Sequence, residues 1–409
     1  MLLVGIDWAE AEHAACLLDA TGAVLRRLRV PHTAAGLRQL CAEIAEHELD
    51  SSTVFVAIER PDGLVVDALI DAGYCLYSLN PKVVERYRGR TRVAVAKTDP
   101  ADAELLARIL VTDRDRHRPM LPSSALVQEI RALARDDERA GRDERRLLSR
   151  LRHDLLAVFP QALVAFPDLA STTALAFLAR WPSAESASGA SDVDLAALLR
   201  EHRHGWPGRA ADRIRAALNA EALTASTHLA RAKAGTIRLE AEQLLLLHRQ
   251  RVAWRRQLAD LLAGEGAHPD GEVLLSLPGL DARLAARLLG EIGDRRERFP
   301  TPASLQCYAG TAPVTKASGK SRVVSARLAC NRFLRQAVLW WAFGSLRTSQ
   351  WARTFYDAQR ATGRRHHQAL RALGNRWLEI LHHLLATGQH YDEAVHQRNR
   401  TKGPQPAAA

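Results

Sequence analysis

The chain has 409 residues, and its 57 Lys and Arg against 46 Asp and Glu give a net charge of +11. With 47% hydrophobic and 25% charged residues, its composition is that of a globular protein with room for two or three domains. The five cysteines are scattered, which argues against a disulfide scaffold or a zinc finger. The sequence contains no run of eighteen apolar residues that could span a membrane, so we expect a cytoplasmic protein. Its positive charge suits binding of DNA or RNA.

The first 120 residues alternate short apolar strands with amphipathic helices. The hydrophobic pattern predicts strands over 2–9, 12–19, 24–30, 54–59 and 74–79, and helices over 33–48, 63–72 and from about residue 99. The order βββαβαβα is typical of an RNase H-like fold, in which an antiparallel meander joins parallel strands covered by helices. We therefore predict an α/β domain over residues 1–120.

Four acids stand at matching positions in this predicted domain. Asp7 lies in the first strand, Glu59 ends the fourth strand beside it, and Asp99 and Asp102 are three apart at a helix start. A carboxylate in a buried strand is costly to desolvate unless a cation lies beside it. An all-oxygen site suits Mg²⁺ or Mn²⁺, and two such ions would stabilise both oxygens exchanged at a phosphorus. The alternative for the last two acids is ordinary helix N-terminal placement.

Residues 121–262 are predicted to form an all-α region. Apolar residues recur at spacings of three and four over 121–160 and 208–262, which indicates long charged helices. The Ser, Ala and Gly-rich stretch 183–194 is predicted to be a loop. The periodicity allows either a coiled-coil arm for dimerisation or an intramolecular bundle.

Residues 263–409 are predicted to form a mainly α domain. Residues 273–281, with Pro278-Gly279 and a following helix, resemble a helix-hairpin-helix element whose amides contact backbone phosphate, although a plain αα-turn fits too. Further on, Ser318 lies between small residues in a Lys and Arg-rich loop. That setting would suit a nucleophile attacking a phosphodiester, and the alternative is a polar linker with an incidental serine.

Most of the positive charge lies at the C-terminal end. From residue 331 onward the sequence contains twelve Lys or Arg and four Asp or Glu, so a charge of +8 out of the total of +11 lies there. We expect this region to bind nucleic acid, although a solvated basic surface is the alternative. The basic residues nearest the serine and at the start of the next predicted helix are Lys316, Lys320, Arg322, Arg332 and Arg335.

Several short motifs, taken together and in order, resemble the DEDD transposases of bacterial insertion sequences, the one-ten family. They are Gly5-Ile6-Asp7, Ile58-Glu59, residues 97–103, Leu277-Pro278-Gly279, Phe299-Pro300, Tyr308-Ala309-Gly310, Ala312-Pro313, Ser318-Gly319-Lys320 and residues 331–335. The resemblance implies a RuvC-like domain over 1–120, a coiled-coil region over 121–262 and a C-terminal transposase domain over 263–409. Arg60-Pro61-Asp62-Gly63 departs from the small residues that often follow the family's glutamate.

The resemblance also implies a mechanism. Asp7, Glu59, Asp99 and Asp102 would bind magnesium, and Ser318 would attack a DNA phosphate to form a phosphoserine intermediate. A structured bridge RNA would pair with donor and target DNA. The acids of one subunit would work beside the serine of another, so we expect a homo-oligomer, a dimer or tetramer, acting at the bacterial nucleoid without a membrane.

Three rival functions start from the same residues. A RuvC-like nuclease or resolvase would use the acids without Ser318, and a non-catalytic nucleic-acid-binding protein would need neither centre. A sugar kinase or actin-like ATPase also begins with a Gly-Ile-Asp strand. Such an enzyme needs a phosphate loop rich in glycine and hydroxyl groups directly afterwards, whereas Trp8-Ala9-Glu10 follows here, which argues against it.

Overall fold

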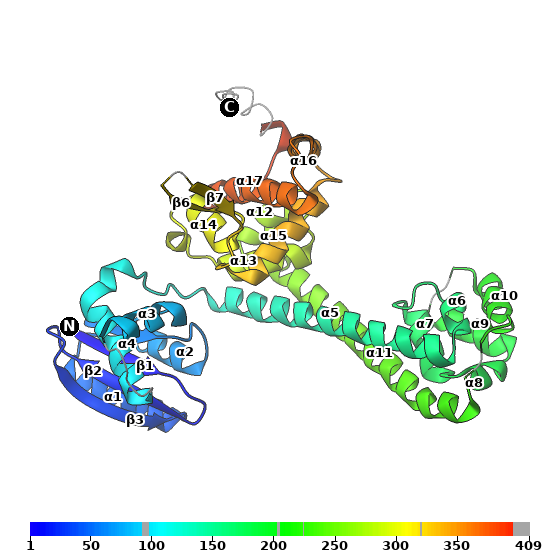
Figure 1. Ribbon diagram of the computed structural model, residues 1–409, viewed down its shortest axis with the longest axis horizontal. Coiled ribbons are helices and arrows are strands. Elements are labelled where there is room, and N and C mark those ends of the chain that lie inside the picture. Colours follow the sequence, from blue (N-terminus) through cyan, green and yellow to red (C-terminus); the bar gives the residue numbers. More distant parts are fainter. Residues whose placement is uncertain (92–97, 203–204, 224, 320, 396–409) are drawn as a thin grey trace. The chain divides into compact units, whose positions relative to one another are not determined.

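The computed structural model describes residues 1–91, 98–202, 205–223, 225–319 and 321–395. The chain forms two compact units, Met1–Pro122 and Ser123–Ala409, and most of their helices and strands are labelled in Figure 1. Among the described residues, no helix combines the length and the apolar character needed to cross a bilayer.

The first unit is built on a five-stranded mixed sheet in the order β3-β2-β1-β4-β5. β1 pairs antiparallel with β2 and parallel with β4, so the predicted neighbourhood of the first and fourth strands is confirmed. The continuous apolar run of β1 suits this central position, because both of its faces are covered. The strands are β1 (Leu2–Asp7), β2 (Glu12–Leu18), β3 (Val24–Pro31), β4 (Val54–Ile58) and β5 (Cys75–Ser78).

Helices cover both faces of this sheet. α1 (Ala34–His47) and α2 (Leu64–Asp71) pack on the face of Val4 and Ile6, and α4 (Asp99–Asp113) packs on the face of Leu3 and Ala57. These helices confirm the predicted order. α3 (Pro81–Thr91) was not predicted, because five of its eleven residues are charged and, of its side chains described, Val84 alone is fully buried. Short turns of 3-10 helix lie at η1 (Ser51–Thr53) and η2 (Arg114–Arg116).

Gly5 lets α4 lie directly on β1. A Cβ atom at this position would overlap the backbone carbonyl oxygen of Ala103 and would come within 2.5 Å of the Ala107 nitrogen. Because both atoms belong to helix backbone, no side-chain rotation could relieve the clash. The close approach therefore requires glycine and fixes α4 over the middle of β1.

We expect Gly5→Ala to destabilise the first unit by about 1–3 kcal/mol, since the added methyl group must push a helix off the sheet. Hydrogen–deuterium exchange of peptides from β1 and α4 in the full chain should become faster. Gly89→Ala in α3 is the matched control, because nothing lies within 4 Å of its added Cβ atom. Unchanged exchange in Gly5→Ala would contradict the packing described here.

The second unit begins with two long helices that pack against each other within the chain. α5 (Ala125–Val158) and α11 (Thr227–Ala263) contact along their length, and the helices between them form a lobe with its own apolar core (Figure 1). The lobe consists of α6 (Gln161–Ala165), α7 (Thr172–Arg180), α8 (Ala184–Ser188), α9 (Asp192–Glu201) and α10 (Pro207–Leu218).

Two predictions for this region were wrong. The stretch 183–194 is not simply a loop, because α8 and the start of α9 lie within it. Ser183 and Ser191 are the N-terminal capping residues of these helices. In each case the serine side chain accepts a hydrogen bond from the backbone N–H of the third helical residue, whose side chain accepts one from the serine backbone N–H. The predicted helix over 208–262 is instead two helices, α10 and α11.

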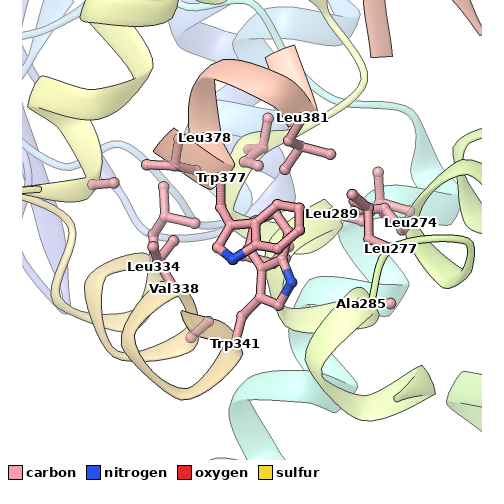
Figure 2. Close-up of a cluster of buried hydrophobic side chains, with 14 of the residues drawn as sticks. Leu274, Leu277, Ala285, Leu289, Leu334, Val338, Trp341, Trp377, Leu378 and Leu381 are labelled. Carbon is pink, nitrogen blue, oxygen red and sulfur yellow. The ribbon is translucent and has the colours of Figure 1, made fainter. Parts of the chain in front are cut away.

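The C-terminal part of the second unit is mainly helical, as predicted, with one small hairpin. Its core contains Trp341 and Trp377, whose ring centroids are 5.0 Å apart (Figure 2). Ile130 of α5 and Leu258 of α11 belong to the same core, so the long helices are anchored here. The elements are α12 (Asp270–Leu275), α13 (Ala282–Ile292), η3 (Arg296–Arg298), α14 (Pro302–Ala309), β6 (Val314–Ser318), β7 (Ser321–Ser325), α15 (Arg332–Ser345), α16 (Gln350–Ala361) and α17 (His366–Thr387).

Candidate active-site residues

Asp7 and Glu59 lie at the same end of two neighbouring parallel strands. Asp7 is the last residue of β1, and Glu59 directly follows β4, where Ile6 pairs with Ile58. Adjacent strands lie about 4.8 Å apart. Because side chains alternate along a strand, Asp7 shares the face of Gly5, which is the face that α4 covers. Both acids are half-buried there.

α4 brings its N-terminal end to this edge of the sheet. Ala103, in its second turn, lies over Gly5, whereas Val111 near its C-terminal end lies beside Gly22. Gly22 follows β2, whose last residue Leu18 pairs with Leu3 at the start of β1. α4 thus runs against the direction of β1, and its first turn lies towards Asp7. That turn carries Asp99 and Asp102, so all four acids lie at one edge of the sheet.

The two helix acids differ in their surroundings. Asp99 is exposed, whereas Asp102 is buried and accepts a hydrogen bond from the Arg88 guanidinium at 2.7 Å. A buried carboxylate needs a positive partner, and Arg88 of α3 supplies one. Across the described residues, no three His, Cys, Asp or Glu side chains are grouped closely enough to hold a metal ion. The structure therefore brings the acids to one edge but not into a closed cage.

Aromatic and cationic side chains flank the acidic residues in sequence. The Arg60 guanidinium carbon lies 4.3 Å from the Trp8 ring centroid, and Trp8 stacks on His13. A hydrogen bond of 2.8 Å joins the His13 and His32 rings, and burial together with His32 lowers the pKa of His13. This cluster was not predicted. The sequence feature that could have revealed this cluster is the position of Trp8 and Arg60, which directly follow Asp7 and Glu59.

In the second unit, Ser318 lies at the tip of an exposed hairpin. It is the last residue of β6 and pairs with Ser321, the first residue of β7. Gly319 turns the chain with a φ of +55°, a conformation that favours glycine. The described residues of both strands are exposed, apart from half-buried Val314 at the base. The hydroxyl is therefore open to a large ligand.

The predicted basic residues divide between this hairpin and the following helix. Lys316 and Arg322 are exposed on the two strands, whereas Lys320 lies outside the described residues. Arg332 is exposed in the first turn of α15, and Arg335 is half-buried one turn later. Lys316 lies on the same face of the hairpin as Ser318, whereas Arg322 pairs with Ala317 and lies on the opposite face. A cation beside the serine suits binding of a phosphate.

A buried polar network holds the segment that leads from the hairpin into α15. The side-chain oxygen of Asn331 caps α15, and its amide nitrogen donates to Glu291 at 2.7 Å and to the Tyr308 hydroxyl at 2.9 Å. Arg135 of α5 donates two hydrogen bonds to the same Glu291, at 2.7 and 3.0 Å. Burial has the largest single effect on the pKa of Glu291 and raises it. The hydrogen bonds from Arg135 and Asn331 together have a larger, opposite effect, so the pKa of Glu291 lies below its ordinary value.

The Pro278-Gly279 turn joins α12 to α13 and packs against α15. Gly279 has a φ of +81°, and a Cβ atom there would overlap the backbone nitrogen of Ser345. The Pro278 carbonyl accepts a hydrogen bond from the Trp341 indole at 3.1 Å. The turn therefore has an internal packing role, and its contact with phosphate stays a prediction.

Comparison with known proteins shows the family. Residues 4–160 match a transposase family model for the IS110 group, and residues 271–357 match a second one described as the transposase IS116/IS110/IS902 family. The mini-circle transposase for IS117 of Streptomyces coelicolor is 38% identical over 95% of both chains. The 43.6 kDa protein of insertion element IS110 from the same organism is 30% identical over 96% of both. The 42 kDa protein of insertion element IS900 of Mycobacterium paratuberculosis is 28% identical over 96% of this chain and 97% of that protein. The chain belongs to the IS110 family of insertion-sequence transposases, enzymes that recombine DNA.

Proposed function

We propose that the chain cuts and rejoins DNA strands with Ser318 as the nucleophile and the four-acid edge as a metal-binding site. The observation that carries the proposal is that this transposase has two groups of residues suited to the chemistry of a DNA phosphate. One is the set of Asp7, Glu59, Asp99 and Asp102 at one sheet edge, and the other is the exposed Ser318 with Lys316 on the same face of its hairpin. The sheet would be a RuvC-like variant of the RNase H-like fold.

The acids suit a hard divalent cation. Their oxygen atoms are the donors that Mg²⁺ and Mn²⁺ prefer, and bound cations would supply charge neutralisation at the reacting phosphate. Asp7 and Glu59 would hold the ions from the strand ends, and Asp99 and Asp102 from the helix. Arg88 now neutralises Asp102, so it would have to share or release this carboxylate.

In the proposed reaction, the Ser318 oxygen forms a bond to a DNA phosphorus, and the bond from phosphorus to the leaving deoxyribose oxygen breaks. The serine proton leaves, the departing oxygen takes up a proton, and a phosphoserine ester remains. Attack on this ester by the hydroxyl of a second strand would restore both the serine and a phosphodiester. Lys316, on the same face of the hairpin as Ser318, would screen the phosphate charge during each step.

We further propose that a structured RNA guides this reaction and that the acting species is a homo-oligomer. The net charge of +11 supports binding of nucleic acid. Base pairing would then choose the target and donor sequences, while the protein contributes backbone contacts and chemistry. The family resemblance supports the completion of one site by acids and serine from different subunits.

Asp7→Asn tests the metal site with little change in shape. We expect it to reduce strand joining at least about 100-fold in Mg²⁺, since one ligand charge is lost, and to weaken Mn²⁺ binding measured by electron paramagnetic resonance. RNA binding should stay within a few-fold of wild type. Asp67→Asn, on the exposed side of α2, is the matched control. Wild-type joining and Mn²⁺ affinity in Asp7→Asn would contradict the proposed site.

A further inference from the structure

The C-terminal part of the second unit contains an open groove of about 900 Å³ that the proposed reaction does not use. Its walls come from α14, from the base of the β6–β7 hairpin and from α16 and α17. Pro313, Val324 and Ser325 mark the hairpin base. The groove therefore begins on the same two strands that carry Ser318 at their other end.

The charge of the groove suits an anion. Arg364, Arg371 and Arg376 line it, and among the described lining residues Glu379 is the single acid. Arg376 pairs with that acid at 2.9 Å, and both side chains are about half exposed, so the pair is weak. Arg364 donates to the Gln359 side chain. The lining thus carries a surplus of two positive charges.

The floor of the groove offers a fixed amide. The Asn375 side-chain oxygen accepts a hydrogen bond from buried Thr311 at 2.8 Å, which directs the two donors of its nitrogen elsewhere. Gln306 donates to the Asn375 backbone carbonyl at 2.9 Å and holds this turn of α17. Phe355 adds an aromatic side chain to the lining. Amide, hydroxyl and aromatic groups beside arginines match the base edges, base faces and phosphates of a nucleic acid.

We propose that this groove binds an unpaired stretch of nucleic-acid strand and directs it along the hairpin towards Ser318. From Val314 to Ser318 the strand rises about 13 Å, a distance that a few nucleotides cover. The direction towards Ser318 rests on the proposed function, whereas the binding itself does not. In a duplex the bases are stacked on one another, so Phe355 would have no free base face to contact; an unpaired strand offers one.

The first test measures the affinity of the full chain for a short fluorescein-labelled oligothymidylate by anisotropy. We expect Arg371→Gln to weaken binding about five- to tenfold and to lower the salt dependence by about one counterion. Arg353→Gln on α16 makes the same charge change outside the groove and should stay within about twofold of wild type. Equal losses in the two variants would overturn the proposal, because charge alone would then explain binding.

The second test needs no variant. Photocross-linking of wild-type protein to 5-iododeoxyuridine and 5-iodouridine oligonucleotides, followed by peptide mapping, should label residues 301–313, 324–326, 355–359 or 364–379. Preference for one probe tells whether the groove takes DNA or RNA, and both results support it. Cross-links confined to other peptides would overturn it. Failure here leaves Ser318 chemistry intact, whereas failure of the Ser318 experiments leaves groove binding intact, so the two outcomes are distinguishable.

Discussion

Ser318→Ala is expected to abolish joined product, a loss of about 1,000-fold or more, while binding of DNA and RNA stays within a few-fold of wild type. The substitution removes the hydroxyl that would attack phosphorus, and alanine cannot replace it. Ser318 is exposed at the hairpin tip, so its loss should cost little stability. The measurement is a strand-joining assay with purified protein, the proposed guide RNA and both DNA partners.

The hairpin offers its own control. Ser321→Ala removes a hydroxyl from the residue directly paired with Ser318 and keeps the strand geometry. We expect near-normal joining from this variant. Joined product from Ser318→Ala would exclude the serine mechanism and favour a RuvC-like nuclease that activates water. Equal loss in both variants would instead assign the hydroxyls a shared role.

The largest expected effect on stability is that of Glu291→Ala, about 3 kcal/mol. Glu291 is 5% exposed and accepts hydrogen bonds from Arg135 and Asn331, so its truncation leaves a buried cation and an amide without their acceptor. Denaturant unfolding of the full chain measures the loss. Asp357→Ala breaks the exposed pair with Arg353 and should cost about 0–1 kcal/mol. Similar values for the two variants would contradict the network's role.

The same network predicts a pH dependence. The pKa of Glu291 is lowered in the folded chain, so its contribution to stability is fully present above the ordinary glutamate pKa of about 4.3. That contribution is lost as pH falls below this value and through the lower folded pKa. Unfolding of Glu291→Gln should therefore depend less on pH in this acidic window than unfolding of the wild type. If the stability of the wild type and of Glu291→Gln fell equally as the pH was lowered, this role of Glu291 would be contradicted.

Much of the first unit could be predicted because its central strands, β1 and β4, are buried on both faces. Continuous apolar strands and regular helices leave clear periodic signals, and parallel topology then brings the ends of β1 and β4 together. The placement of Asp7 and Glu59 followed from that reasoning. The pairing of Asp102 with Arg88 did not, because it depends on α3, whose charged sequence gives little periodic signal.

The second unit was harder to predict because its decisive contacts are distant in sequence. The groove joins residues near 306 to residues near 375, and the Glu291 network joins α5 to α13 and α15. Short helices such as α8 were not predicted, because a composition rich in Ser and Ala usually indicates a loop. Serine also caps the N-termini of helices, as Ser183 does for α8, and this could have indicated a helix there.

Trapping the covalent intermediate tests the proposed chemistry most directly. Wild-type protein is mixed with the proposed guide RNA, Mg²⁺ and labelled donor DNA, quenched in detergent and digested for mass spectrometry. We predict a nucleotide attached to the peptide that carries Ser318, present in Ser321→Ala and absent from Ser318→Ala and Asp7→Asn. Cleaved and joined DNA without any protein adduct, or an adduct that survives in Ser318→Ala, would contradict Ser318 as the nucleophile.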